Sequence, residues 1–370
     1  MLDRLGRLRA RMADEGLDGF LVGAPVEDIF HTHGANRRYL SGFTGSSGWL
    51  LVTTESAFIA VDFRYFDQAQ REAPAFILFQ ANGGIEKWFG ALVSEAGLAG
   101  KRIGFEPGDL TVGAYRSLRK AIAGMPAEQR PRLGPTKPIV SELRAVKERE
   151  EVAALERAVA LGDAAFIAVS RRIEPGWTER QIAWEIESYA REHGAQGMSF
   201  PTIVAAGSWG AMPHAQPRNY AVQEGEPIVI DMGVILDGYC SDLTRTIVLG
   251  RPDPKFYQIY DIVLTAQRTA EELIRTGMSG EEAHMLAYNV IAEAGFGENF
   301  GHGLGHGVGL LIHEAPRLAK TSRDVLKDGM VVTVEPGVYL PGWGGIRIED
   351  QTVLENGRVR VLSRSPKLLA

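Results

Sequence analysis

Three histidines within sixteen residues are the first feature of the sequence that could do chemistry. The segment "NFGHGLGHGVGLLIHE", residues 299–314, holds His302, His306 and His313. Histidines four residues apart can bind zinc from one face of a helix. Here glycine occupies every second position from 301 to 309, and each glycine costs a helix interior about 1 kcal/mol relative to alanine. The segment is therefore predicted to be extended backbone, in which the histidines need partners from elsewhere in the chain.

Four carboxylates stand in apolar segments that are predicted to be strands. Asp231 interrupts "PIVIDMGV", and Asp242 lies beyond the Asp-Gly turn of a predicted hairpin, where it could meet Asp231 across the ladder. Glu335 ends "VVTVE", and Glu349 follows Arg347 by two residues, on the same strand face, in "GIRIEDQTVL". A buried carboxylate without a partner is costly. Any one of the four could pair with an arginine or cap a turn, but together with the histidines they indicate a shared cation site.

The ligand chemistry of such a site narrows the choice of cation. Carboxylates with an imidazole favour hard or borderline ions such as Mn²⁺, Co²⁺, Fe²⁺ or Zn²⁺ over soft thiolate metals. Four carboxylates exceed what one tetrahedral zinc ion needs. They suit two ions about 3.5–4 Å apart, bridged by carboxylates and water. The sequence therefore predicts a dinuclear metal centre.

The elements that must position these residues fall into two predicted domains. Residues 1–135 alternate strand-like runs with helix-like stretches, as in a small α/β domain. The proline-containing stretch 125–140 interrupts the periodicity and is the expected boundary. Residues 136–370 show two helices followed by strands and then the same order again, with one long helix expected to begin near residue 141. We expect an α/β (α+β) fold whose second domain contains duplicated helix–helix–strands units.

Composition limits the classes of partner. The 370 residues carry a formal net charge of −6, which offers no basic field for nucleic acid or an anionic membrane. No apolar run approaches the roughly 18 residues of a spanning helix, and the N-terminal segment lacks the apolar core of a targeting peptide. Cys240 is the single cysteine, which excludes an intramolecular disulfide. We expect a cytoplasmic protein that binds neither nucleic acid nor membrane.

The motifs around these residues resemble those of the pita-bread metallopeptidases, in particular the Xaa-Pro branch of aminopeptidase P and Xaa-Pro dipeptidase (prolidase). The resemblance rests on "VIDMGVILDGYCSD", "GHGVGLLIHE", "VEPGVY" and "IRIED", and on "YLSGFTGSSGWLLVT" and "VDFRYFDQAQ" in the first domain. It implies a creatinase/prolidase-like N-terminal domain, a C-terminal pita-bread catalytic domain, and two divalent ions per subunit, with Mn²⁺ expected first and Zn²⁺ or Co²⁺ as alternatives. The implied metal ligands are Asp231, Asp242, His306, Glu335 and Glu349.

The resemblance also implies roles for other polar residues. His214, in "GAMPHAQP", and His313 match the histidines that handle substrate and protons, and Glu335 is the implied proton relay. The implied reaction is hydrolysis of the bond between an N-terminal residue and a following proline, in peptides or dipeptides, by a homodimer. Three further active-site positions, which bind substrate or orient the ligands, are matched by His302, Tyr339 and Arg347.

The resemblance leaves a choice between two activities. We expect the aminopeptidase P type, because "SGFTGSSG" and "DFRYFDQA" resemble its leading domain more closely. The alternative is Xaa-Pro dipeptidase. Phe200 and Pro201, where longer aminopeptidase P enzymes carry polar residues, leave open how the substrate's amino end is held. Metal-free creatinase-type chemistry and a non-catalytic pita-bread peptide-binding protein are disfavoured because the ligand set is intact, and methionine aminopeptidase is disfavoured by the leading domain.

Overall fold

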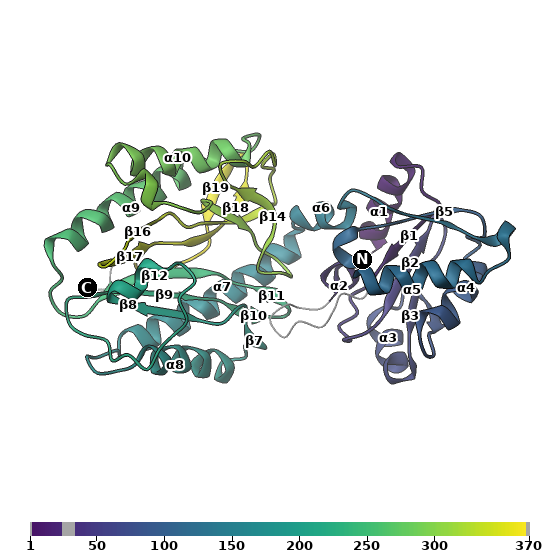
Figure 1. Cartoon of the computed structure of the whole chain (residues 1–370), viewed down its shortest axis with the longest axis horizontal. Coiled ribbons are helices and arrows are strands. Elements are labelled where there is room, and N and C mark those ends of the chain that lie inside the picture. Colours follow the sequence, from purple (N-terminus) through teal and green to yellow (C-terminus); the bar gives the residue numbers. More distant parts are fainter. Residues whose placement is uncertain (1, 24–33, 368–370) are drawn as a thin grey trace. The chain divides into compact units, whose positions relative to one another are not determined.

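The computed structural model describes residues 2–23 and 34–367 of the chain (Figure 1). The chain divides into two compact units, Met1–Arg144 and Ala145–Ala370. This division falls C-terminal to the 135/136 boundary that the proline-containing stretch suggests. Strand β6 (Arg132–Pro135) completes the sheet of the first unit, and helix α6 (Ile139–Ala145) is tied to that unit by hydrogen bonds from Ser141 to Glu106.

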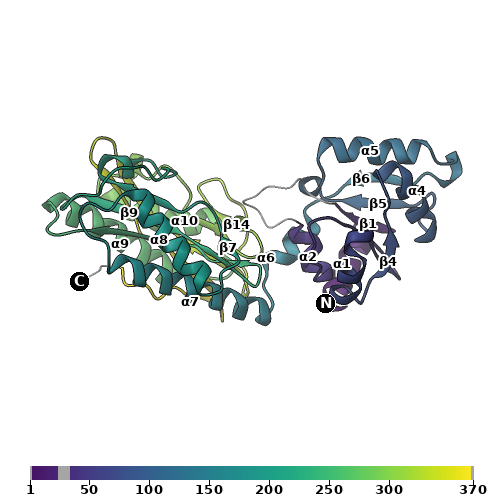
Figure 2. The same ribbon diagram turned by 90° about the horizontal axis from the view of Figure 1, so that it is seen from below.

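The N-terminal unit is built on a six-stranded sheet in the order β4-β3-β2-β1-β5-β6, with helices on both faces (Figure 2). β1 pairs antiparallel with β2 and parallel with β5. Besides β6, this sheet contains the strands β1 (Gly19–Val22), β2 (Trp49–Thr53), β3 (Ala57–Val61), β4 (Ile77–Gln80) and β5 (Arg102–Phe105). Its other helices are α1 (Leu2–Asp14), α2 (Ala35–Ser41), α3 (Phe66–Glu72), α4 (Ile85–Glu95) and α5 (Val112–Ala123), with the short 3₁₀ helices η1 (Phe63–Tyr65), η2 (Pro107–Asp109) and η3 (Ala127–Gln129).

The C-terminal unit contains the predicted helix–helix–strands order twice, which confirms the duplication. The first half has α7 (Arg149–Ser170) and α8 (Glu179–Glu192), then β7 (Gly197–Met198), β8 (Ile203–Ala206), the 3₁₀ helix η4 (Gly207–Ala211), β9 (Pro227–Met232), β10 (Val234–Leu236), β11 (Tyr239–Cys240) and β12 (Leu243–Val248). These strands form two sheets, in the orders β11-β10-β7 and β12-β9-β8.

The second half repeats the order with a larger sheet. Its helices are α9 (Pro254–Leu273), α10 (Gly280–Glu293) and the 3₁₀ helix η5 (Gly297–Asn299). The strands form a sheet in the order β14-β13-β15-β18-β19 and the hairpin β16-β17. The two long helix pairs lie on opposite sides of the strands (Figure 1). The strands are β13 (Gly305–Gly307), β14 (Glu314–Leu318), β15 (Val331–Val334), β16 (Gly337–Leu340), β17 (Gly344–Arg347), β18 (Asp350–Glu355) and β19 (Arg358–Val361).

The prediction of one long helix from residue 141 is wrong, because the chain leaves the helix between α6 and α7. Val146 forms an isolated bridge with Met330, and the backbone N–H of Lys147 donates to the carbonyl of Gly329 at 2.8 Å. Glu148 then caps α7 in a reciprocal capping box. Pairing with a strand far along the sequence therefore overrides the helical pattern.

The hairpin predicted at Asp237-Gly238 is confirmed. Both residues have positive φ, 52° and 78°, and they join the antiparallel strands β10 and β11, as a tight two-residue turn requires. Among the helices of the described residues, none is long and apolar enough to cross a membrane.

Candidate metal centre

Three carboxylates gather where β9, β12 and β18 meet. Asp231 lies on β9 opposite Thr244 of β12, and Asp242 directly precedes β12. Asp231 and Asp242 are therefore diagonal neighbours across the antiparallel ladder of β9 and β12, as the sequence predicts, and the turn between β10 and β11 connects the two arms. Glu349 directly precedes β18. All three are buried, and each offers an oxygen that lies within 4.8 Å of the oxygens of the other two.

His306 brings a second group of donors to the same place. Its Nε2 atom lies 3.5 Å from Oδ2 of Asp242 and 3.4 Å from Oε1 of Glu335. His306 is on β13, and Glu335 directly follows β15. Asp242 thus stands between two sets of donors, one with Asp231 and Glu349 and the other with His306 and Glu335. The structure brings together all five residues for which the sequence predicts metal binding.

Burial and like charge perturb this group strongly. Loss of solvent, followed by the charge of neighbouring carboxylates, holds the pKa of Asp242 and that of Glu349 well above their usual range. Burial raises the pKa of Glu335 to about 7. Burial also lowers the pKa of His306 to about 3, so its imidazole is neutral and can donate a lone pair. Carboxylates this crowded hold protons tightly when no cation compensates their charge.

A buried oxygen without a partner tests whether divalent cations fit the site. Oδ1 of Asp231 is buried and accepts no hydrogen bond from any described residue, whereas Oδ2 accepts one from Nη2 of Arg347 at 2.5 Å. Such an oxygen is costly unless it is satisfied. It stands beside two further carboxylates, and the neutral imidazole of His306 faces the same group. Oxygen donors with one imidazole suit hard or borderline divalent cations, so the residues fit the metal.

Thr244 holds Glu349 in place and was missed by the sequence analysis. Its hydroxyl donates to Oε2 of Glu349 at 2.6 Å and accepts from Nε of Arg347 at 3.1 Å. It is fully buried. Thr244 follows Asp242 by two residues, which places both side chains on one face of an extended segment. That spacing was the signal that could have found it.

Thr333 plays the corresponding part for the second group and was also missed. Its hydroxyl donates to Oε1 of Glu335 at 3.0 Å and accepts from the backbone N–H of His306 at 3.0 Å. Close approach of the two strands needs Gly305, because a Cβ there would lie 2.0 Å from the carbonyl oxygen of Thr333. The glycine pattern of this segment therefore lets the histidine strand pass close to its neighbour, as the sequence predicts.

A chain of hydrogen bonds links His302 to a carboxylate of the centre. Nδ1 of His302 lies 2.7 Å from the carbonyl of Gly303 and so carries the proton, while Nε2 accepts from the hydroxyl of Tyr339 at 2.8 Å. Tyr339 in turn accepts from Nη1 of Arg347 at 2.9 Å, and Nη2 of Arg347 donates to Asp231. Burial lowers the pKa of His302 to about 4, so this imidazole is also neutral.

His313 lies beside the second group of donors. Its ring centroid is 4.3 Å from that of His306, and its side chain is exposed. The expected extended segment here is a series of bends over residues 309–313 before β14 begins. Glu314 anchors these bends: its carboxylate accepts from the backbone N–H of Leu311 at 2.8 Å and faces Nζ of Lys147 at 3.5 Å, in a buried ion pair.

His214 reaches the site through its neighbour in sequence. The carbonyl of Pro213 accepts from Nη1 of Arg347 at 3.4 Å. The ring of His214 is exposed, and within the described residues no hydrogen bond fixes its orientation. The structure thus places this residue at the edge of the site without fixing the direction of its side chain.

Comparison with known proteins agrees with the geometry. The profile of metallopeptidase family M24 matches residues 153–356, and that of the creatinase/prolidase N-terminal domain matches residues 4–146. The chain therefore belongs to metallopeptidase family M24. It is a metallo-exopeptidase in which a creatinase/prolidase-type domain precedes a pita-bread catalytic domain along the sequence.

Three relatives cover nearly the whole chain. An Xaa-Pro dipeptidase from Pyrococcus horikoshii is 34% identical over 353 residues, which span 95% of this chain and 96% of the relative. The structure of an Xaa-Pro dipeptidase from Bacillus anthracis has a TM-score of 0.91 at 37% identity and covers 100% of this chain and 99% of its own. That of an X-Pro aminopeptidase from Thermotoga maritima has a TM-score of 0.86 at 32% identity, with 97% and 100% covered.

Proposed function

We propose that this protein is an Xaa-Pro dipeptidase, which hydrolyses the bond between an N-terminal residue and proline in a dipeptide. The observation that carries the proposal is the convergence of five candidate metal ligands, with Asp242 at the centre of the group. The dipeptidase reading takes the place of the expected aminopeptidase P reading. It is supported by two relatives named Xaa-Pro dipeptidases that match along almost the full chain. The X-Pro aminopeptidase structure is less similar than that of the Bacillus anthracis dipeptidase.

The expectation of an aminopeptidase rested on motifs that do not separate the two activities. "SGFTGSSG" and "DFRYFDQA" lie in the leading domain, and that domain matches a profile named for creatinase and prolidase alike. Substrate length depends on how far the cleft extends beyond the proline, and no motif of the leading domain reports that distance.

The donor geometry suggests how two divalent cations would be held. Asp231, Asp242 and Glu349 would hold one, and Asp242, His306 and Glu335 would hold the other, so that Asp242 is shared. The oxygen-rich ligand set favours Mn²⁺, with Co²⁺ or Zn²⁺ as alternatives. Divalent cations, when bound, polarise the scissile carbonyl and lower the pKa of water at the site.

The residues of the chain supply proton transfer and positioning. Glu335, whose Oε1 is held by Thr333, takes the proton of the attacking water and passes it to the proline nitrogen, which has no proton of its own before cleavage. His313 and His214, both exposed at the edge of the site, donate hydrogen bonds to the developing oxyanion or to the substrate's carboxylate. Arg347 fixes the orientation of Asp231.

Turnover on matched substrates tests the proposal. Purified protein is treated with EDTA, supplied with Mn²⁺, Co²⁺ or Zn²⁺ in turn, and assayed on Ala-Pro and Ala-Pro-Ala. We expect hydrolysis of the dipeptide, strongest with Mn²⁺, and little hydrolysis of the tripeptide. Efficient cleavage of the tripeptide would restore the aminopeptidase reading. If Glu335→Ala keeps near full activity on both substrates, the catalytic role given to Glu335 is wrong.

Two further properties stay predictions. We propose a homodimer, which analytical ultracentrifugation would test, and a cytoplasmic location, which cell fractionation would test. A non-catalytic peptide-binding protein remains disfavoured, because such a protein has no need of five converging metal ligands.

A further inference from the structure

A pocket lies against helix α10, and one of its lining residues, His302, is connected to the metal centre. Its volume is about 450 Å³, within the size range of small-molecule sites. It is walled by α10, the segment 297–303 and residues 319–321. Among the described residues, its lining includes His302 but none of the five candidate metal ligands. His302 is therefore the residue through which the lining of the pocket is connected to the metal centre.

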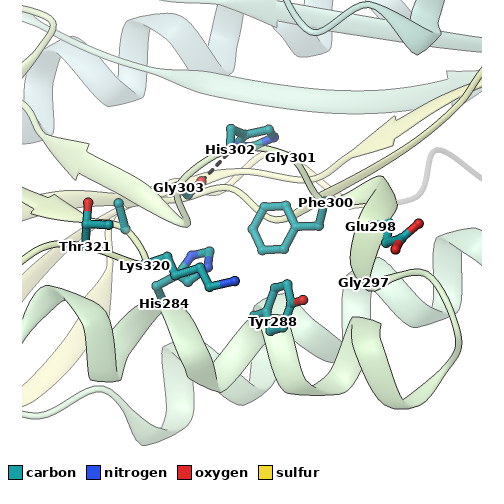
Figure 3. A pocket seen from close by; sticks show the side chains of 11 residues that line it. His284, Tyr288, Gly297, Glu298, Phe300, Gly301, His302, Gly303, Lys320 and Thr321 are labelled. Carbon is teal, nitrogen blue, oxygen red and sulfur yellow. Dashed lines mark hydrogen bonds between the residues drawn. The ribbon is translucent and has the colours of Figure 1, made fainter.

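The pocket presents opposite charges on either side of an aromatic wall. Figure 3 shows Lys320 and Glu298 at opposite ends, with Phe300 and Tyr288 between them. Nζ of Lys320 lies 5.5 Å from the centre of the Tyr288 ring, and both Lys320 and Glu298 are exposed to solvent. Phe300 is 4% exposed, so an occupant would meet a mostly buried aromatic ring between two solvent-exposed charges.

An unsatisfied polar atom in the wall points to a ligand. His284 is 3% exposed, and its Nδ1 has no hydrogen-bond partner among the described residues. Burial, and then the charge of Lys320, lowers the pKa of His284, so the imidazole is neutral. A neutral imidazole can donate one hydrogen bond to a carboxylate. A cation and such a donor at one end with an anion at the other match a small zwitterion whose side chain contacts the aromatic rings.

A continuous series of contacts connects this pocket to the metal centre. The ring centroids of His284 and Phe300 are 5.4 Å apart, and those of Phe300 and His302 are 5.1 Å apart in an edge-to-face arrangement. From His302 the hydrogen bonds described above run through Tyr339 and Arg347 to the metal-binding carboxylate. An occupant that shifts the Phe300 ring would therefore alter the contact of that ring with His302.

We propose that this pocket binds a free amino acid, such as proline, and that its occupancy lowers turnover through Phe300 and His302. The choice of amino acid as ligand rests on the charges of the pocket. The interpretation of this binding as inhibition by the reaction product rests on the proposed function, because hydrolysis of an Xaa-Pro dipeptide releases free amino acids. The expected kinetic sign is a fall in kcat, with the Michaelis constant for the dipeptide little changed.

Binding to metal-free protein tests the site independently of catalysis. L-proline is titrated calorimetrically into EDTA-treated full-length protein, and into Lys320→Ala and Glu298→Gln. We expect one site per chain, and an affinity about tenfold weaker in each variant, since each loses one charge-assisted hydrogen bond. Lys327→Ala removes an exposed lysine outside the pocket and is the matched control, expected to bind like wild type. Unchanged binding in Lys320→Ala, or equal loss in Lys327→Ala, overturns the assignment.

Two further arms separate the parts of the proposal. Acetate and methylamine carry one charge each; if acetate alone binds as tightly as proline, the site is an anion site and the zwitterion assignment is wrong. In the second arm, proline is added during dipeptide hydrolysis, and inhibition is expected in wild type but reduced in Lys320→Ala. Binding without inhibition refutes the coupling. If the protein cleaves no dipeptide, the proposed function fails while the calorimetric result still decides the site.

Discussion

In metal-free protein the negative charge that Glu335 acquires as the pH rises lowers the free energy of unfolding. Glu335→Gln stays uncharged and is expected to abolish this destabilisation. Burial raises the pKa of this carboxyl from 4.5 to about 7 in the folded chain, so the folded state binds the proton more tightly than the unfolded state. Stability contributed by the proton is complete below about pH 4.5 and is lost as the pH rises through 7. At 1.36 kcal/mol for each pKa unit, the charged form costs about 3 kcal/mol.

The other groups of the site define the pH window for the measurement. The raised pKa values of Asp242 and Glu349 act in the same direction as that of Glu335. The lowered pKa values of His302 and His306 act in the opposite direction, but only below their ordinary value of 6.5. Between about pH 6.5 and 8.5, Glu335 alone should lower the free energy of unfolding of the metal-free protein by about 1 kcal/mol.

Urea denaturation followed by circular dichroism at several pH values across this window is the assay. We expect the free energy of unfolding of EDTA-treated wild type to fall with rising pH. At pH 8.5 the free energy of unfolding of Glu335→Gln should be about 1–3 kcal/mol higher than that of wild type. Glu293→Gln, at an exposed position of α10, is the control and should follow wild type. Excess Mn²⁺ should reverse the slope in wild type, because the ligands bind cations in their deprotonated form. A metal-free stability that is flat or rises with pH would refute the reasoning.

Two substitutions test parts of the fold that support the site. Lys147→Met leaves the carboxylate of Glu314 buried without its cation and should lower the free energy of unfolding by about 3–5 kcal/mol in urea denaturation; a loss below about 1 kcal/mol would contradict a buried pair. Gly305→Ala puts a Cβ 2.0 Å from the carbonyl oxygen of Thr333, so β13 must shift, and Mn²⁺ affinity measured by calorimetry should fall about tenfold or more. Gly301→Ala, whose Cβ would meet nothing within 4 Å, should bind like wild type.

The candidate metal ligands were predictable because each violates the local pattern around it. A carboxylate such as Asp231 inside an apolar strand has to be compensated, and the alternating glycines around His306 exclude the helical alternative. Neither threonine violates its local pattern, because a buried threonine is compatible with any strand, and only the two-residue spacing of Thr244 from Asp242 points to the site. Their role depends on what lies across the sheet: Thr244 reaches Glu349, which is more than 100 residues away in sequence.

Long-range pairing also explains where local reasoning fails. The residues between α6 and α7 fit a helical pattern, but Val146 pairs with Met330 and the chain is extended there. By contrast, Asp242 was correctly expected to meet Asp231, because β9 and β12 are the two arms of one antiparallel hairpin and pair directly. The Asp237-Gly238 turn itself was correctly predicted, since its positive φ values are a local requirement.

The five candidate metal ligands are divided between the two halves of the catalytic domain. Asp231 and Asp242 come from the first helix–helix–strands unit, and His306, Glu335 and Glu349 come from the second. Divalent cations bound by these residues would link the two halves, and neither half could form the site alone. A chain in which only one half is folded, or in which the two halves have been cleaved and separated, cannot assemble the site. Peptide cleavage therefore requires the intact catalytic domain.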